Sequence, residues 1–124
     1  MEKPAPILVI DDNPTDLKLI SSLLKNQGYD VSCSDEASEG IEMALDMNPA
    51  LIVLDVMLPI INGYNICRLI KDQKEYAHIP ILLLTSRVTE EDRRIGLEAG
   101  ADAYIPKPFK TEHLLETVEH LLSS

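Results

Sequence analysis

The feature that most constrains the fold is a fivefold alternation between a short apolar run and a longer stretch with helical apolar spacing. Such alternation is typical of βα units, in which crossover helices join parallel strands. Each apolar run is only about four residues long and shows no regular polar alternation, as expected for strands buried on both faces. The predicted strands cover residues 7–10, 31–34, 51–54, 81–84 and 103–105.

Capping residues and glycines mark where the five intervening helices begin and end. Asn13 and Pro14 supply an N-cap and a first-turn proline for the first helix, which Gly28 ends. Thr89 opens a capping box for the fourth helix, which Gly100 ends. The other three helices are expected to begin near Asp35, to follow Asn62-Gly63 and to span about residues 111–122. The inward faces of all but the fourth would carry Leu17, Ile20, Leu24, Ile41, Ala44, Leu45, Ile66, Leu69, Ile70, Leu114, Leu115, Val118, Leu121 and Leu122.

Length and composition agree with a single α/β domain and exclude several classes of protein. The chain has 124 residues, which is enough for one compact domain with a buried core. Hydrophobic residues make up 45% of the chain but aromatic residues only 4%, so the core must be aliphatic. With 11 basic and 21 acidic residues the formal net charge is −10, which argues against nucleic acid and anionic membranes as direct partners.

Nothing in the sequence indicates export or membrane insertion, so we expect a soluble, cytoplasmic protein. Residues 1–4 lead straight into an apolar run and lack the layout of a signal peptide. The longest apolar runs, such as residues 79–84, are far shorter than the roughly 18 residues that a membrane span needs. Cys33 and Cys67 form no metal or redox motif, and we expect both to be buried and reduced.

Polar residues gather where the predicted strands end. Asp11 and Asp12 follow the first strand, Asp55 the third, Thr85 the fourth, and Lys107 comes just after the fifth. In a parallel sheet with right-handed crossovers the carboxyl ends of the strands form one rim, where the ligand crevice lies. We therefore expect three carboxylates, a hydroxyl and an amine to lie close together.

These three acids require positive charge. Two carboxylates about 4 Å apart repel by roughly 4 kcal/mol at an effective dielectric constant near 20. Lys107 supplies one positive charge, and a hard divalent ion such as Mg²⁺ would complete the site because it prefers oxygen ligands. A metal ion, a lysine and a hydroxyl around a carboxylate are suited to phosphoryl transfer, which makes Asp55 a candidate covalent acceptor.

Four motifs follow one another along the chain: Asp11-Asp12, Asp55 followed by Leu58-Pro59 and Gly63, Thr85-Ser86, and Lys107-Pro108-Phe109. Their order and spacing resemble the receiver domain of two-component response regulators. The resemblance covers the whole chain and implies a flavodoxin-like α/β sandwich: a five-stranded parallel sheet in the order 2-1-3-4-5 flanked by five helices. It also implies one receiver domain over residues 1–124, with no output domain in this chain.

The resemblance assigns chemical roles to the acids. Asp55 would be the phosphoacceptor, and its donor would be a sensor histidine kinase, a phosphotransfer protein or a small molecule such as acetyl phosphate. Asp12, Asp55 and the backbone carbonyl of Met57 would hold Mg²⁺ or Mn²⁺, with Asp11 acting mainly through water. In this view the protein is a signalling domain that assists its own phosphorylation and dephosphorylation and is not a conventional enzyme.

The resemblance also assigns a switch. Lys107 would pair with Asp55 and then with a phosphoryl oxygen, and its bond to Pro108 would be cis. Thr85 would donate its hydroxyl to the phosphoryl group, and Tyr104 would turn inward as Thr85 moves. This movement would reshape the face formed by the helix that ends at Gly100, the strand at 103–105 and the helix at 111–122, which is the form that a phosphorylation switch takes.

Three further features bear on lifetime and partners. Met57 and Arg87 occupy the positions that tune phosphoryl lifetime in this family, and Met57 cannot hydrogen-bond a water, so we expect slow self-dephosphorylation. Ile60 and Ile61 stand where relatives have polar residues; either they contact a partner or one of them folds back onto the following helix. Residues 87–110 carry five basic and five acidic residues in an otherwise acidic chain. That segment is a candidate interface, for a downstream effector or for a homodimer.

Several alternatives stay open at this point. Asp11 and Asp12 could only cap the first helix, Thr85 could be an ordinary strand residue, and Tyr104 could be half-buried packing. A Mg²⁺-dependent phosphohydrolase similar to the haloacid dehalogenases would need a second Asp two residues after Asp55, where Met57 stands. A pseudo-receiver that only binds partners is the third class. The histidines at 78, 113 and 120 show no metal spacing and are expected at the surface.

Overall fold

Five βα units build the part of the chain that the computed structural model describes, residues 5–87 and 89–123. The elements are β1 (Pro6–Ile10), α1 (Pro14–Asn26), β2 (Asp30–Ser34), α2 (Ala37–Met47), β3 (Leu51–Asp55), α3 (Gly63–Lys71), β4 (Ile81–Thr85), α4 (Glu90–Glu98), β5 (Ala103–Pro106) and α5 (Thr111–Ser123). All strand pairs are parallel, and the order β2-β1-β3-β4-β5 confirms the expected flavodoxin-like arrangement.

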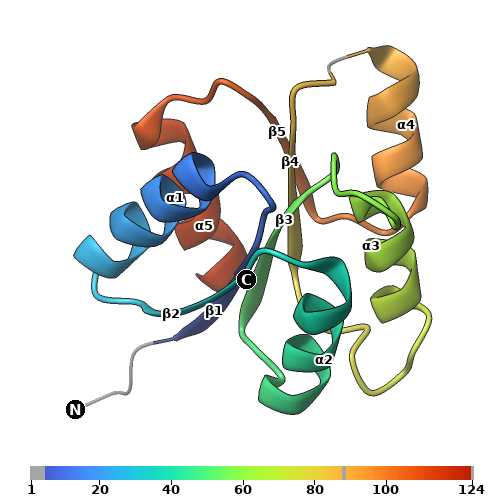
Figure 1. Ribbon diagram of the computed structural model, residues 1–124, viewed down its shortest axis with the longest axis horizontal. Helices are drawn as coiled ribbons and strands as arrows, with labels where there is room; N and C mark the ends of the chain where they lie inside the picture. Colours follow the sequence, from blue (N-terminus) through green and yellow to red (C-terminus); the bar gives the residue numbers. More distant parts are fainter. Residues whose placement is uncertain (1–4, 88, 124) are drawn as a thin grey trace.

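The sheet separates two apolar clusters. Figure 1 shows α1 and α5 on one side of the sheet and α2, α3 and α4 on the other. Alternate strand residues point to opposite faces, so Ile7 and Val9 join the cluster under α1 and α5, whereas Leu8 and Ile10 join the cluster under the other three helices. Every residue of β3 and β4 is buried, which makes these strands the rigid centre from which the rim residues emerge.

The expectation that all five strands are buried on both faces is wrong for the two at the edges. Only Ser34 of β2 is buried and Asp30 is exposed, and Ile105 is the one buried residue of β5. Each edge strand pairs with a single neighbour and is covered less fully. Three strands also run one residue further than predicted, so that Asp55, Thr85 and Pro106 are the last residues of their strands.

Most of the predicted helix ends are confirmed. Asn13 caps α1 by accepting the Asp16 N–H, with Pro14 in the first turn, and Thr89 caps α4 in the same way. Gly28 and Gly100 have φ values of 93° and 97°, a region in which a Cβ atom is strained. The second helix begins two residues later than expected, at Ala37, because Glu36 is the N-cap residue and gives no side-chain cap.

Most of the predicted inward-facing residues are confirmed; the exceptions are Leu45, which is half-buried and belongs to neither apolar cluster, and Leu69. This α3 residue is 41% exposed, whereas its neighbour Ile70 is fully buried. Cys67 is buried as expected, but Cys33 is only half-buried because it lies on the edge strand β2; both thiols are free. The expectation of a surface position is confirmed for all three histidines.

None of the helices in residues 5–87 and 89–123 combines the length and the apolarity that crossing a bilayer would take. Residues 1–4, on which the signal-peptide argument depends, lie outside the described residues, as do Val88 and Ser124.

Candidate functional site

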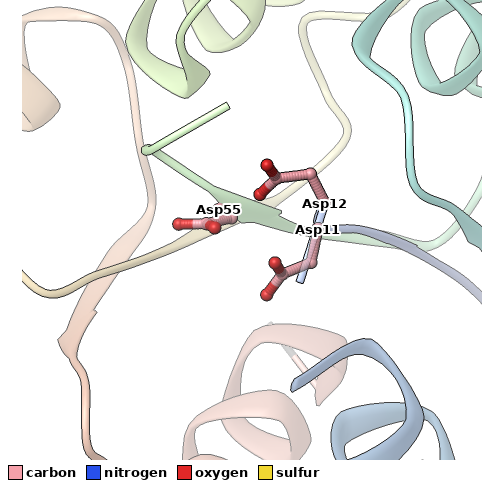
Figure 2. Close-up of side chains that lie close together, drawn as sticks. All are labelled: Asp11, Asp12 and Asp55. Atoms are coloured by element: carbon pink, nitrogen blue, oxygen red, sulfur yellow. The ribbon is translucent and has the colours of Figure 1, made fainter. Parts of the chain in front are cut away.

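The three predicted acids lie together at the carboxyl ends of β1 and β3, as Figure 2 shows. One carboxylate oxygen from each of Asp11, Asp12 and Asp55 lies within 4.8 Å of the others. Asp11 is 1% exposed and Asp55 is 5% exposed, whereas Asp12 is open to solvent. The adjacent central strands β1 and β3 bring these residues together, because the chain leaves both at the same edge of the sheet.

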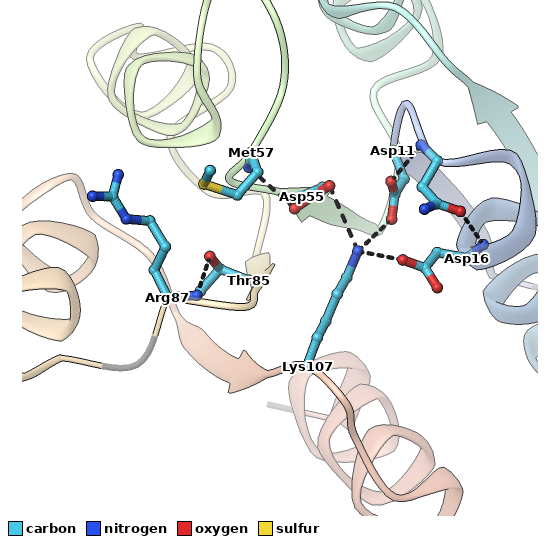
Figure 3. Close-up of polar contacts among 8 residues, drawn as sticks. Asp11, Asp16, Asp55, Met57, Thr85, Arg87 and Lys107 are labelled. Atoms are coloured by element: carbon cyan, nitrogen blue, oxygen red, sulfur yellow. Dashed lines mark hydrogen bonds and ion pairs between the residues drawn. The ribbon is translucent and has the colours of Figure 1, made fainter.

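Lys107 lies among these acids, as Figure 3 shows, but it is closer to two of them than to Asp55. Its Nζ is 2.8 Å from Asp11 Oδ2, 2.9 Å from Asp16 Oδ2 and 3.5 Å from Asp55 Oδ2. Burial by itself lowers the pKa of Lys107, but the hydrogen bonds to Asp11 and Asp16 outweigh it and leave that pKa raised. The charged ammonium is therefore favoured, and it is shared among three carboxylates.

Asp16 is a residue of this site that the sequence reasoning missed. It lies in the first turn of α1, five residues after Asp11, and its side chain reaches Lys107 from the helix start. The sequence signal that could have identified Asp16 is its position in the first turn of a helix that begins at the carboxyl edge of the sheet. An acid at that position is usually explained by its favourable interaction with the helix dipole, so the contact with Lys107 was not predicted.

Asp55 is the acid whose environment most disfavours its charge. Its pKa is raised from the ordinary 3.8 to about 6, mainly by burial and to a smaller extent by the nearby Asp11 carboxylate. The Met57 N–H, which donates to Asp55 Oδ1 at 3.1 Å, and the charge of Lys107 oppose this shift. A buried carboxylate beside a second one is stabilised by added positive charge, so the set Asp11, Asp12 and Asp55 suits a hard divalent cation.

Thr85 and Arg87 lie on the other side of Asp55 from Asp11 and Asp16 (Figure 3). Thr85 is fully buried at the end of β4, and its Oγ1 accepts the Arg87 N–H at 3.0 Å. That bond leaves the hydroxyl proton of Thr85 available for an oxygen in the site.

Two cavities open beside the acids, and Met57 separates them. A cavity of about 510 Å³ is lined by Asp55, Lys107, Ser86 and Phe109, and one of about 890 Å³ runs between α3 and α4. Asp12 and Met57 line both cavities. The Met57 side chain is 48% exposed and apolar, so it lies at the cavity wall beside Asp55 without offering a group that could activate water.

The two isoleucines after Pro59 behave differently. Ile61 folds back and packs against the cluster under α2, α3 and α4, as one of the two interpretations expected. Ile60 is fully exposed with φ at 73°, and the Ile61 N–H donates to the Pro59 carbonyl at 2.8 Å, so Ile60 is the centre of a γ-turn. A β-branched residue is rare in this conformation.

Beneath that loop, Gly63 fits directly against the strand that carries Asp55. A Cβ atom at Gly63 would lie 2.5 Å from the Asp55 carbonyl oxygen and 2.7 Å from the Val56 Cα. The Gly63 N–H also donates to the Val56 carbonyl at 2.9 Å. Glycine is therefore required here by the close approach of α3 to the backbone of Asp55.

Tyr104 is half-buried on β5, and its hydroxyl donates to the Arg87 carbonyl. The peptide bond between Lys107 and Pro108 is cis, as the resemblance implied.

In the segment with equal numbers of acids and bases, residues 87–110, Arg94 contacts Glu91 at 3.7 Å and Glu98 at 2.9 Å. These charges therefore pair with one another along α4.

Comparisons with known proteins agree with this geometry. Residues 7–119 match the model of the response regulator receiver domain. Among curated proteins, the chain is similar to the DNA-binding dual master transcriptional regulator RpaA of Synechocystis sp., with 39% identity over 94% of this chain and 48% of that protein. The DNA-binding response regulator MtrA of Mycolicibacterium smegmatis is 35% identical over 90% of this chain and 48% of that protein. The chain therefore spans about half the length of these relatives.

Two solved structures illustrate the likeness in fold. A putative response regulator from Chloroflexus aurantiacus is 30% identical, with a TM-score of 0.93 over 98% of this chain and all of that chain. The receiver domain of a sensor histidine kinase from Pseudomonas aeruginosa, described with a magnesium ion coordinated in the active site cleft, is 30% identical, with a TM-score of 0.89 over 98% and 99% of the two chains. The family match, the sheet order and the acid cluster lead to one conclusion: the chain belongs to the receiver domains of two-component response regulators, a family of signalling domains.

Proposed function

We propose that this chain is a phosphorylation-controlled signalling module in which Asp55 accepts a phosphoryl group. The donor would be a sensor histidine kinase, a phosphotransfer protein or a small molecule such as acetyl phosphate. The observation that carries the proposal is the position of Asp55: a buried carboxylate at a cavity wall, 3.5 Å from Lys107 and within one cluster with two further acids.

Asp12, Asp55 and the backbone carbonyl of Met57 are the proposed ligands of Mg²⁺ or Mn²⁺, and Asp11 would act mainly through water. The chemistry of the donor set supports this assignment, because the site holds four carboxylates, those of Asp11, Asp12, Asp16 and Asp55, and one ammonium group, that of Lys107. The Pseudomonas receiver domain, with magnesium in its cleft, supports it by similarity. When bound, the ion neutralises charge on the acids and on the phosphoryl oxygens.

The residues of the chain would divide the transfer among them. An oxygen of Asp55 forms a bond to phosphorus as the P–N bond of a phosphohistidine, or the P–O bond of acetyl phosphate, breaks and its electron pair leaves with the imidazole or the acetate. Lys107 would exchange one of its carboxylate partners for a phosphoryl oxygen. Thr85 would donate its free hydroxyl proton to another phosphoryl oxygen.

The two other classes of function are less well supported. A phosphohydrolase of the dehalogenase type needs an acid two residues after the nucleophile, and the apolar Met57 stands there. A pseudo-receiver would have no reason to keep Asp12, Asp55 and Lys107 around one cavity, with Thr85 at the end of the adjacent strand β4. Met57 also argues for slow self-dephosphorylation, with Arg87 as the second lifetime-tuning position.

We propose that phosphorylation changes the conformation of the α4-β5-α5 face and that partners recognise this change. Tyr104 links this face to Arg87 and hence to Thr85, so a change at Thr85 can reach the surface of α4 and β5. We propose that the single receiver domain over residues 1–124 signals in the cytoplasm, either to an effector protein in trans or through an output domain outside this sequence. A homodimer through this face is a second use of the same surface, and direct binding to nucleic acid or membrane is not proposed.

Acetyl phosphate tests the proposal directly. In the presence of Mg²⁺ the wild-type chain should gain one phosphoryl group by intact-mass analysis, and Asp55→Ala should gain none. Asp46→Ala, which removes an exposed acid on α2, is the matched control and should behave as wild type. If wild type gains no phosphoryl mass, or if Asp55→Ala gains as much, the proposed function is wrong. After the donor is removed, loss of the group within seconds would contradict the assigned role of Met57.

A further inference from the structure

We propose that Tyr64 is a positioning residue for Tyr104, holding the Tyr104 hydroxyl at the Arg87 carbonyl and so favouring the phosphorylated form. This inference rests on the proposed function and deepens it, because it adds α3 to the elements that control the switch. Tyr64 belongs neither to the sequence motifs nor to the group formed by Asp11, Asp12, Asp55 and Lys107.

The contacts of Tyr64 place it between α4 and β5. Its side chain is 7% exposed, and its hydroxyl donates to the Asp92 carbonyl in the first turn of α4 at 3.1 Å. The same oxygen lies 3.4 Å from the hydroxyl oxygen of Tyr104. Tyr64 is the second residue of α3, so its hydroxyl links α3 to α4 and to β5.

The number of hydroxyl protons explains why the contact between Tyr64 and Tyr104 can form and break at little cost. Two hydroxyl groups carry two protons, but three contacts compete for them: Tyr64 to Asp92, Tyr104 to Arg87, and Tyr64 to Tyr104. While Tyr104 bonds to the Arg87 carbonyl, its oxygen can still accept the Tyr64 proton. If Tyr104 leaves, Tyr64 keeps its bond to Asp92 and loses only the second acceptor. Tyr64 therefore favours the inward position of Tyr104 without being destabilised when Tyr104 departs.

The Arg87 peptide connects this pair to the active site. Its N–H donates to Thr85 Oγ1 at 3.0 Å, and its carbonyl accepts the Tyr104 hydroxyl. A series of hydrogen bonds thus runs from Thr85 through Arg87 to Tyr104 and on to Tyr64. Because α3 starts at the end of the loop that follows Asp55, the series returns to the strand that carries the phosphoacceptor.

Packing keeps the Tyr104 ring beside α4. A Cβ atom at Gly96 would lie 3.1 Å from Cδ2 of Tyr104, so the ring lies directly on the helix backbone. Burial, and then the contact with Tyr104, raise the pKa of Tyr64 above its usual range, so the protonated hydroxyl is favoured.

Beryllofluoride with Mg²⁺, a mimic of the bound phosphoryl group, provides the measurement. Tyr64→Phe removes one hydroxyl and keeps the buried ring, and we expect it to weaken beryllofluoride binding about threefold, the effect of one neutral hydrogen bond. In a Tyr104→Phe background the same change should have no further effect, because the partner hydroxyl is already gone. Tyr76→Phe is the matched control: its hydroxyl donates to the Leu45 carbonyl at 3.3 Å, away from the switch, and binding should not change.

A second readout needs no ligand. In protein labelled with 3-fluorotyrosine, the ¹⁹F resonance assigned to Tyr104 by its loss in Tyr104→Phe should shift in Tyr64→Phe and stay in place in Tyr76→Phe. Unchanged binding and an unchanged Tyr104 resonance in Tyr64→Phe would overturn the inference, as would equal losses in the wild-type and Tyr104→Phe backgrounds. If wild type and Asp55→Ala are both indifferent to beryllofluoride, the proposed function fails instead, and the ¹⁹F comparison still decides whether Tyr64 positions Tyr104.

Discussion

The acid pocket, formed by Asp11, Asp12, Asp55 and Lys107, and the tyrosine pair, Tyr64 and Tyr104, are held together in opposite ways. In the acid pocket one ammonium bridges buried carboxylates at 2.8 and 3.5 Å. The tyrosine pair is held by neutral hydroxyls whose oxygens are 3.4 Å apart. Hydrogen bonds to charged groups contribute about 1.5–3 kcal/mol each, and neutral ones only about 0.5–1.5 kcal/mol.

The difference agrees with the functions that we propose for the two regions. Phosphoryl transfer gains from charges that are already in position, so the acid pocket tolerates repulsion among its carboxylates to keep them there. A switch needs two positions close in free energy, and weak neutral contacts supply them. We therefore expect changes in and around the acid pocket to alter the free energy of unfolding strongly, in either direction, and changes at the tyrosine pair to alter it little while changing the response.

The largest expected effect is at the glycine beneath the acid pocket. Gly63→Ala puts a Cβ atom 2.5 Å from the Asp55 carbonyl oxygen, and backbone cannot move aside as a flexible side chain would. We expect a loss of about 3 kcal/mol in the free energy of unfolding, measured by urea denaturation, and slower phosphorylation by acetyl phosphate. Asn65→Ala, at an exposed position in the same turn of α3, is the control and should lose less than about 1 kcal/mol. A Gly63→Ala variant as stable as wild type would show that the acid pocket is not rigidly packed.

A smaller and pH-dependent effect is expected at Asp55. Because burial raises its pKa from 3.8 to about 6, the charged form is disfavoured in the folded state. The stability contributed by Asp55 is therefore fully present below pH 3.8 and is lost as the pH rises through 6. Asp55→Asn removes this penalty, and in metal-free buffer at pH 7.5 we expect it to be more stable than wild type by about 2 kcal/mol, after allowing for the lost contact with Lys107.

Denaturation across pH checks this expectation. The difference between Asp55→Asn and wild type should shrink towards zero near pH 4, and Mg²⁺ should stabilise wild type more than the variant. Asp46→Asn, an exposed acid, should show neither effect. A variant less stable than wild type at pH 7.5 would mean that Asp55 is stabilised by its surroundings, which contradicts the raised pKa.

The fold and the acid pocket could be predicted because both depend on local patterns. Strand length, capping by Asn13 and Thr89, and glycines at helix ends are all written in short stretches of sequence. The acids could be grouped because parallel strands end at one rim. The exposure of Leu69 and the half-buried edge strand β2 could not be seen, because they depend on which neighbours each element acquires in three dimensions.

Residues whose roles come from distant partners were missed. Asp16 contacts Lys107, 91 residues away in the chain, and Tyr64 contacts Tyr104, 40 residues away. An acid in the first turn of a helix and a tyrosine on a buried helix face both have ordinary local explanations. Only the folded arrangement distinguishes these explanations from a contact with the active site or with the switch.

The smallest stability effect, and the sharpest test of the comparison, is at Gly96 beneath the tyrosine pair. Gly96→Ala places a Cβ atom 3.1 Å from Cδ2 of Tyr104 and 3.4 Å from Cδ1 of Leu83, both side-chain atoms that can yield. Alanine also favours helix by about 1 kcal/mol over glycine, which offsets the crowding, so unfolding free energy should change by less than about 0.5 kcal/mol. The displaced Tyr104 ring should nevertheless weaken beryllofluoride binding and move the Tyr104 ¹⁹F resonance. If Gly96→Ala instead destabilises the protein as much as Gly63→Ala, the tyrosine pair is as rigidly packed as the acid pocket. The proposal that the switch depends on weak contacts would then be wrong.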